Sequence, residues 1–316
     1  MLVEGLLEIS RMYILTRRSF CLAAFGLALG ITLPARGQDS VPDRASEKDN
    51  MTSKALDAIR SLETSHGGRL GVAVFDTGLR RRLQYRADES FAMCSTHKFL
   101  SAVAVLSLAD QGKLDLDKPV KYGKTDILDY APVAKKHVDR GFMTVDELCA
   151  AATVWSDNTA ANLLIELLGG PAGWTRFARS IGDNASRLDR TEPALNSAIP
   201  GDPRDTTTPD AMLANLQQTL LGTVLSDSSR EKLQNWMLSG TITDTLLRAG
   251  VPLTWRVGDK SGAGRNGTRN DIGIIFPPNA SPILAAIYYT ESTGSLASRE
   301  EVIAGVGGII AKTFGA

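Results

Sequence analysis

The sequence contains few cysteines, histidines and aromatic residues, and it carries no net charge. Its 316 residues include three cysteines and three histidines, and 35 basic side chains balance 35 acidic ones. A balanced charge gives no reason to expect nucleic acid or an anionic membrane as a partner. The chain also lacks the G-x-S-x-G turn of many esterases and a glycine loop for phosphate. Several enzyme classes are thereby disfavoured.

The histidines, His66, His97 and His137, follow no spacing typical of a zinc site or of a Ser-His-Asp triad. We therefore expect neither a metal nor a cofactor. His97 comes two residues after a serine discussed below, and we interpret it as a side chain that packs or faces solvent.

The sequence also has no apolar run long enough to span a bilayer, since the run near the N-terminus is too short. This run follows the paired arginines at 17 and 18 and precedes Ala35-Arg36-Gly37, which supplies small residues at a plausible cleavage point. This order is typical of a twin-arginine export signal. We expect residues 1–37 to be that signal and residues 38–50 a polar linker. The mature chain would then be periplasmic or secreted, without a membrane anchor; an uncleaved anchor is the alternative.

Helix and strand patterns occupy different parts of the chain. Residues 54–68 show apolar side chains at helical spacing, and residues 69–77 alternate at strand period. Three more strand patterns lie between residues 254 and 292, before a helix predicted to open on a capping box from Ser298 to Glu301. Both ends of the chain therefore supply strands.

The middle of the chain is almost entirely helical in pattern. Thr144 with Glu147 predicts a capping box, and Thr208 before Pro209 predicts another helix start. A long irregular segment, residues 187–206, interrupts the helices, and loops of this length are usually functional or mobile.

These patterns predict an α/β plus all-α fold. We expect an antiparallel sheet built from both chain ends, with flanking helices, and an inserted all-helical domain. The sheet domain would comprise residues 51–90 and 240–316, and the helical domain residues 91–239, including the 187–206 loop. We expect the active site between them.

A Ser-x-x-Lys motif, Ser95 to Lys98, stands at the start of an apolar helical run. Residues at i and i+3 share a helix face, so Lys98 can reach the Ser95 hydroxyl. A serine hydroxyl is a weak nucleophile until a neighbour takes its proton. Ser229 and Lys232 repeat the spacing in a polar segment, which we interpret as solvated helix surface. The motif alone therefore indicates little.

Three further motifs follow in chain order. They are the triplet Ser156-Asp157-Asn158, the segment Glu192–Asn196 in the long loop, and Lys260-Ser261-Gly262 on a predicted strand. Arg269 begins the next strand. The set in this order resembles class A serine β-lactamases over essentially the whole mature chain.

The resemblance implies β-lactam hydrolysis and antibiotic resistance. Ser95 would be the nucleophile, and either Lys98 or Glu192 acting through a water would take its proton. Ser156 would pass a proton to the leaving ring nitrogen, and Glu192 would activate the water that hydrolyses the acyl-serine. The residues implied in substrate binding are Asn158, Asn196, Lys260, Ser261, Gly262, Ala263, Arg269 and Tyr130.

Other implied features are structural. The backbone N–H groups of Ser95 and Ala263 would form the oxyanion hole. A cis peptide is expected before Pro193, and Arg190 with Asp205 would form a buried pair that holds the two ends of the loop. We expect a monomer.

After removal of the signal, the cysteines are Cys94 and Cys149. Some relatives pair these positions with cysteines where this chain has Gly264 and Ala102. We therefore expect both thiols to be free and buried, without an intramolecular disulfide.

Two alternatives share part of the motif set. A penicillin-binding DD-peptidase forms the same acyl-enzyme but has no need of the Glu192–Asn196 segment. A non-catalytic β-lactam sensor would keep the acyl group and would be tethered to a membrane. Glu192 argues against both.

Overall fold

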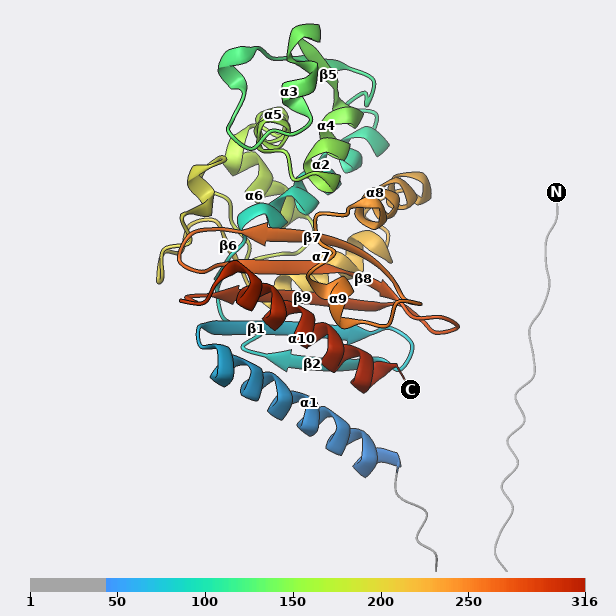
Figure 1. The fold of residues 1–316 in the computed structure, drawn as a ribbon. Coiled ribbons are helices and arrows are strands. Elements are labelled where there is room, and N and C mark those ends of the chain that lie inside the picture. The colour runs from blue at the N-terminus through green and yellow to red at the C-terminus, as the bar shows by residue number, and fades with distance from the viewer. Residues whose placement is uncertain (1–43, 316) are drawn as a thin grey trace, which may run out of the picture. The chain divides into compact units, whose positions relative to one another are not determined.

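A computed structural model describes residues 44–315 (Figure 1). The predicted export signal and residues 38–43 of the predicted linker lie outside the described residues. None of the helices in the described part combines the length and apolar character needed to cross a bilayer.

A five-stranded antiparallel sheet in the order β2-β1-β9-β8-β7 joins the two ends of the chain. Its β1 pairs with β9 along eight residues, from Arg69 opposite Thr290 to Asp76 opposite Ile283. The prediction of an antiparallel sheet built from both chain ends is confirmed. The strands are β1 (Arg69–Asp76), β2 (Arg81–Tyr85), β7 (Arg256–Ala263), β8 (Arg269–Phe276) and β9 (Ile283–Thr290).

The sheet separates two apolar clusters, as alternating side chains of each strand point to opposite faces. On one face, Val72, Ile287 and their neighbours pack with three helices, of which α10 crosses the front of the sheet in Figure 1. On the other face, Ile272 and Tyr288 pack with the helices of the middle of the chain. The first three helices are α1 (Arg44–His66), α9 (Leu247–Gly250) and α10 (Leu296–Phe314).

The linker prediction is wrong for residues 44–50, because α1 begins at Arg44. That stretch has no apolar stripe to indicate a packed helix. It contains Ala, Glu and Lys, which favour helix by propensity.

The middle of the chain forms the predicted helices. Most of them lie beyond the β7 edge of the sheet in Figure 1, whereas α7 packs against β1, β8 and β9. The division into two domains stays a prediction. The longer helices here are α2 (His97–Asp110), α4 (Val145–Val154), α5 (Asn158–Leu167), α6 (Gly170–Ser180), α7 (Pro209–Leu220) and α8 (Asp227–Ser239). The short elements are β3 (Phe91–Ala92), η1 (Cys94–Thr96), β4 (Pro119–Lys121), η2 (Lys124–Asp126), α3 (Ala134–His137), η3 (Val138–Arg140), β5 (Phe142–Thr144), η4 (Ala194–Ser197) and β6 (Thr206–Thr207).

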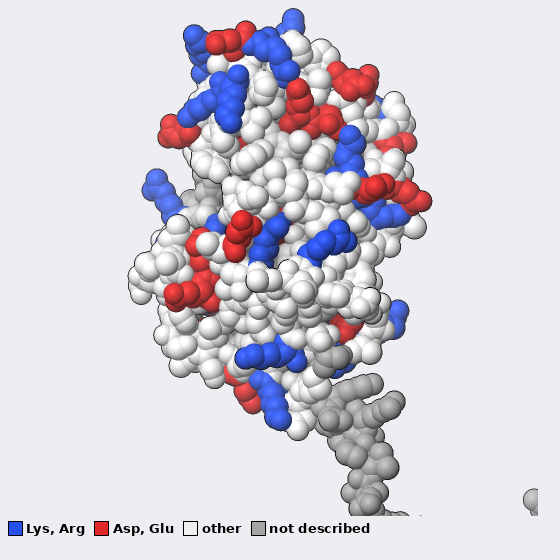
Figure 2. Space-filling view, turned by 45° about the vertical axis from the view of Figure 1, so that its right-hand side comes forward, with Lys and Arg blue, Asp and Glu red and all other residues white. Residues whose placement is uncertain are grey.

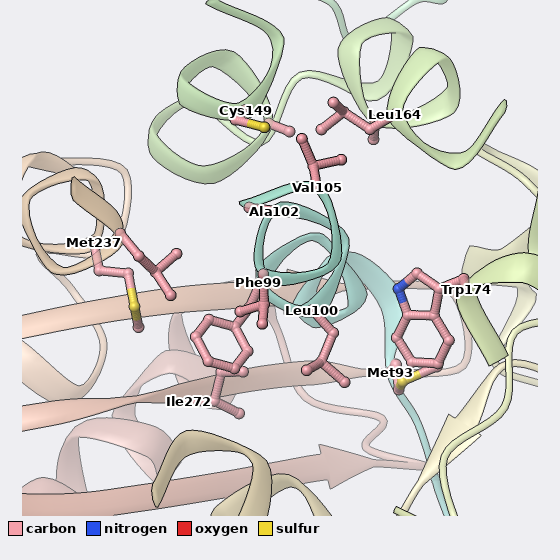
Figure 3. Packing of buried hydrophobic residues seen from close by; sticks show 14 of the residues in the cluster. Met93, Phe99, Leu100, Ala102, Val105, Cys149, Leu164, Trp174, Met237 and Ile272 are labelled. Carbon is pink, nitrogen blue, oxygen red and sulfur yellow. The ribbon is translucent and has the colours of Figure 1, made fainter. Parts of the chain in front are cut away.

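Helix α2 runs through the centre of this helical region and is buried over most of its length. Figure 3 shows Phe99 on the side of Ile272 from β8, and Ala102 and Val105 on the side of Cys149 and Leu164. Apolar contact on all sides fixes the position of the helix, and with it the residues at its N-terminus.

Two of the three predicted helix starts are confirmed. Thr144 accepts from the backbone N–H of Glu147 in a capping box, and Thr208 caps α7 in front of Pro209. The Ser298–Glu301 capping box is wrong: Ser295 is the N-cap of α10 and accepts from Ser298 N at 3.2 Å. Two serines three residues apart offer the same signal, and the upstream one prevails.

The cysteine prediction is confirmed, since Cys94 and Cys149 are both free and buried. Burial raises the pKa of each thiol far above its usual range, so neither forms a reactive thiolate. On the face shown in Figure 2, basic and acidic side chains are interspersed rather than gathered by sign.

Candidate active site

A cavity of about 340 Å³ lies where the N-terminus of α2 meets the edge strand β7. It contains most of the predicted site residues. The lining residues are Ser95, Tyr130, Ser156, Asn158, Asn196, Ile242, Ser261, Ala263 and Arg269. A larger cavity of about 640 Å³ between α2 and α6 contains none of the motif residues, so the smaller cavity is the candidate site.

The turn before α2 places Ser95 at the cavity wall. Cys94 has a φ of 46° and begins the 3₁₀ turn η1. Positive φ is uncommon for a residue with a side chain, and such backbone strain is often found at functional sites. The turn leads directly into α2, so Ser95 and Lys98 stand on one face, with Lys98 Nζ 2.9 Å from Ser95 Oγ.

Lys98 is fully buried and surrounded by oxygen atoms. Its ammonium group donates to Asn158 Oδ1 at 2.6 Å and to the carbonyl oxygen of Ser156 at 2.8 Å. It also lies 2.9 Å from Glu192 Oε1 and 3.3 Å from Ser156 Oγ. A buried cation requires such partners, and the carboxylate supplies the compensating charge.

The Ser-Asp-Asn triplet is held by its central residue. Asp157 caps α5 through Ala160 N, and its second oxygen accepts from the backbone N–H groups of Val133 and Ala134. These bonds fix the turn in which Ser156 adopts a φ of 57°. Ser156 and Asn158 consequently both face Lys98.

Glu192 is buried and reaches the same point from the long loop. Its Oε1 lies 3.4 Å from Ser95 Oγ and 3.4 Å from His97 Nε2, and its Oε2 accepts from Asn196 Nδ2. Burial would raise the pKa of Glu192, but the Lys98 charge, together with His97, holds that pKa well below its usual range. Glu192 is therefore an anion at neutral pH.

The loop around Glu192 is anchored on both sides. The predicted cis peptide is present between Glu192 and Pro193. The predicted ion pair is also present, with Arg190 Nε 2.5 Å from Asp205 Oδ2; Asp205 is buried, but Arg190 is partly exposed. Asp205 additionally accepts from the backbone N–H groups of Asp189 and Arg190, at 2.7 and 2.9 Å, so one carboxylate joins both ends of the loop.

Lys260 and Ser261 lie on β7 beside Ser156. Lys260 Nζ donates to Ser156 Oγ at 3.1 Å and to the Ser261 carbonyl at 2.8 Å. Burial, followed by the charge of Lys98, lowers the pKa of Lys260 to about 7. Gly262 follows on the strand, and a Cβ added there would come 2.8 Å from the carbonyl oxygen of Met93, so only glycine fits.

Arg269 and Tyr130 complete the predicted set at the two sides of the cavity. Arg269 starts β8 and pairs with Glu300 of α10 at 2.9 Å, while its Nε is buried without a partner among the described atoms. Tyr130 is 49% exposed at the cavity rim, and its carbonyl oxygen accepts from Asn158 N. Every predicted site residue thus lies in or beside this one cavity.

Sequence reasoning missed three residues. Asn162 of α5 accepts from Glu192 N and donates to Glu192 O, both at 2.9 Å, and so fixes the backbone of that residue. Its position one turn after Asn158 was the available signal. Ile242 lines the cavity from an irregular segment that carried no motif.

The third is His97, which was interpreted as packing or facing solvent. It is fully buried, so the solvent alternative is wrong, and its ring contacts Glu192. Within residues 44–315, no three His, Cys, Asp or Glu side chains are grouped so that they could hold a metal ion.

Comparison with known proteins identifies the family to which the chain is similar. Residues 54–314 match the profile of the β-lactamase enzyme family. β-Lactamase CTX-M-97 of Escherichia coli is 48% identical over 256 residues, which cover 81% of this chain and 88% of that protein. β-Lactamase OXY-1 of Klebsiella oxytoca is 47% identical over 252 residues, covering 80% and 86%.

The fold gives the same result. The solved structure of an ancestral class A β-lactamase (GNCA) is 55% identical and superposes with a TM-score of 0.81, covering 82% of this chain and all of that one. The family match over residues 54–314 includes the strands and helices that carry the motif residues. The chain therefore belongs to the class A serine β-lactamases, hydrolases that open the β-lactam ring through a serine acyl-enzyme and confer resistance to β-lactam antibiotics.

Proposed function

We propose that Ser95 is the nucleophile and Glu192 the base that completes turnover. The observation that carries this proposal is the contact triangle in which Lys98 Nζ lies 2.9 Å from both Ser95 Oγ and Glu192 Oε1. A hydroxyl, an ammonium and a carboxylate in mutual contact can move a proton away from the nucleophile without exposing a charge to apolar surroundings.

In the acylation step, Ser95 Oγ bonds to the lactam carbonyl carbon and the ring C–N bond breaks. The serine proton passes to Lys98 after the ammonium has given a proton to Glu192, or it passes through a water directly to Glu192, and both routes stay open. Ser156 Oγ, within 3.3 Å of Lys98 and 3.1 Å of Lys260, delivers a proton to the ring nitrogen. The backbone N–H groups of Ser95 and Ala263 stabilise the oxyanion.

In the deacylation step, Glu192 takes a proton from a water that attacks the acyl-serine ester. Asn196 steadies Oε2 of Glu192, and its own Oδ1 is buried without a partner among the described protein atoms. That oxygen is an acceptor for the second hydrogen of the water. A positioned base contributes about 10²–10⁴-fold in rate.

The substrate is a β-lactam, a strained amide that carries a carboxylate. Lys260, Ser261 and Arg269 bind the carboxylate, because cations and a hydroxyl converge on that side of the cavity. Asn158 binds the side-chain amide of the substrate, and Tyr130 forms an aromatic wall at the rim. We further propose that the enzyme acts as a periplasmic or secreted monomer, exported by the twin-arginine route.

The test is intact-protein mass spectrometry of the chain mixed with excess benzylpenicillin, from seconds to hours. Free enzyme should persist while penicillin disappears, and Glu192→Ala should accumulate a Ser95 adduct. If the wild-type chain itself stays stoichiometrically acylated, it acts as a penicillin-binding peptidase or a sensor, and the proposal fails.

A further inference from the structure

His97 is a buried titratable group that the proposed mechanism does not use. It is the first residue of α2, between the two residues of the Ser-x-x-Lys motif, and is fully buried. Its Nε2 lies 3.4 Å from Glu192 Oε1, and its Nδ1 lies 3.3 Å from Ser101 Oγ. The ring therefore connects Ser101 of α2 with the carboxylate of Glu192, the proposed base of deacylation.

The hydrogen-bond partners of His97 suit the protonated ring. Ser101 Oγ donates to the carbonyl oxygen of His97 at 3.1 Å, which leaves a lone pair of that hydroxyl for Nδ1–H. An ionised carboxylate only accepts, so Nε2–H faces Glu192. With both ring nitrogens donating, every polar atom in this chain of contacts has a partner. In a neutral ring that keeps its proton on Nε2, Nδ1 would accept the Ser101 hydroxyl proton, and the His97 carbonyl oxygen would lose its hydrogen bond from Ser101.

Three charged groups face the ring, one from each element that brings charge to it. Glu192 approaches from the long loop, Lys98 from α2 and Lys260 from β7. Trp174 of α6 also approaches, donating Nε1–H to the His97 carbonyl, but it carries no charge. Burial, helped by the two lysines and opposed by Glu192, lowers the pKa of His97 below the ordinary imidazole range. The ring is neutral at pH 7 and gains its proton in acid.

We infer that His97 is a positioning residue that takes up a proton beside Glu192 in acidic solution and thereby slows hydrolysis of the acyl-enzyme. The inference rests on the proposed role of Glu192 as the base. A second cation on Oε1, in addition to Lys98, makes that oxygen a weaker acceptor for the proton of the attacking water.

The test is the deacylation rate of the full chain after rapid mixing with benzylpenicillin, followed by quenched-flow mass spectrometry from about pH 4 to about pH 8, which brackets the imidazole range. His97→Phe retains a ring without a titrating group, and His97→Gln retains a neutral N–H donor. At pH 7 all three proteins should deacylate within about threefold of one another. Toward the acid end the wild-type rate should fall about tenfold or more, as a carboxylate held by two cations loses basicity. Both variants should hold their rates to lower pH.

Thermal unfolding at each pH identifies any loss of rate that comes from unfolding. The inference is overturned if the variants show the same acid fall as wild type, or if they lose rate equally at every pH, which is the signature of a packing role. It is also overturned if wild type shows no acid fall. Glu192→Ala separates the two claims: without an accumulated Ser95 adduct in that variant, the proposed function fails whatever His97 does.

Discussion

The chain contains the same four-residue spacing twice, and only one copy lies in a site. Ser95 and Lys98 are 2.9 Å apart at the buried start of α2. Ser229 and Lys232 lie in the first turns of α8, where Ser229 Oγ donates to Asp110 and Lys232 pairs with Asp146 at 2.6 Å. Each member of the second motif has its own partner elsewhere, and the lysine side chain is 40% exposed.

The difference lies in the surroundings of the lysine rather than in the spacing. Around Lys98 a loop from another part of the chain brings Glu192, and the start of α5 brings Asn158. Lys232 is partly exposed, and its neighbours are the partly exposed carboxylate of Asp146 and the ring of Trp236, whose centroid lies 5.7 Å away. A short motif gives two side chains a common face, and we propose that burial with a shared charge partner makes that face catalytic.

The largest expected effect distinguishes the two serines. Ser95→Ala removes the nucleophile, and kcat for benzylpenicillin should fall about 10⁴-fold or more. Ser229→Ala is the matched control and should leave kcat and KM unchanged, since Ser229 only donates to Asp110. Initial rates by absorbance check both. An active Ser95→Ala enzyme would remove the basis of the comparison.

The second largest expected effect distinguishes the two lysines, Lys98 and Lys232. Lys98→Ala should lower kcat by about 10²–10⁴-fold, the usual contribution of a proton-transfer group. It should also lower stability by roughly 3–5 kcal/mol, because Glu192 is left buried without its counter-charge. Lys232→Ala breaks an exposed pair worth about 0–1 kcal/mol and should not change kcat. Urea unfolding and steady-state kinetics on the same preparations measure the free energy of unfolding and kcat of each variant. Equal stability losses in the two variants would contradict the prediction.

Lys260 offers a pH test of intermediate size. Its pKa of about 7 means that raising the pH through that value removes the charge that attracts the substrate carboxylate. KM for benzylpenicillin should therefore rise with pH above about 7, by up to about tenfold per pH unit, while kcat changes less. Lys260→Arg keeps its charge and should flatten the rise. A KM independent of pH in wild type would exclude this role.

The smallest effect concerns the partner of Ser229. Partial burial acts to raise the pKa of Asp110, but hydrogen bonds from Ser229 and Ser226 hold that pKa below its usual range. A lowered folded-state pKa stabilises the fold above the unfolded pKa, and this stabilisation is lost as the pH falls through the folded value. Asp110→Asn should cost roughly 1 kcal/mol at pH 7, with unchanged kcat. The difference from wild type should shrink below about pH 4.

Contacts within one element, or between residues with strong local signals, could be predicted from the sequence. The Ser95–Lys98 contact follows from helix geometry, and the N-cap at Thr208 follows from the proline behind it. The resemblance to a family supplied Glu192 and the Arg190–Asp205 pair, which no local pattern would join.

Contacts that depend on how the 187–206 loop packs against the rest of the chain could not be predicted from the sequence. The His97–Glu192 approach joins residues 95 positions apart and exists only because the loop packs onto α2. Ile242 enters the cavity from an irregular segment, and its apolar side chain gives no sign of facing a site. The first turns of α1 were missed because their polar residues carry propensity but no pattern.

The pairing of β1 with β9 sets the order in which a nascent chain can complete this structure. Residues 69–76 are made long before their partner in the centre of the sheet, residues 283–290. Until then β1 can pair only with β2, and a two-stranded hairpin is marginally stable in water. Closing so long a loop is slow and leaves an open strand edge meanwhile. A chain truncated before residue 283 would therefore lack the centre of its sheet, and the ribosome must reach β9 before the lactamase fold can exist.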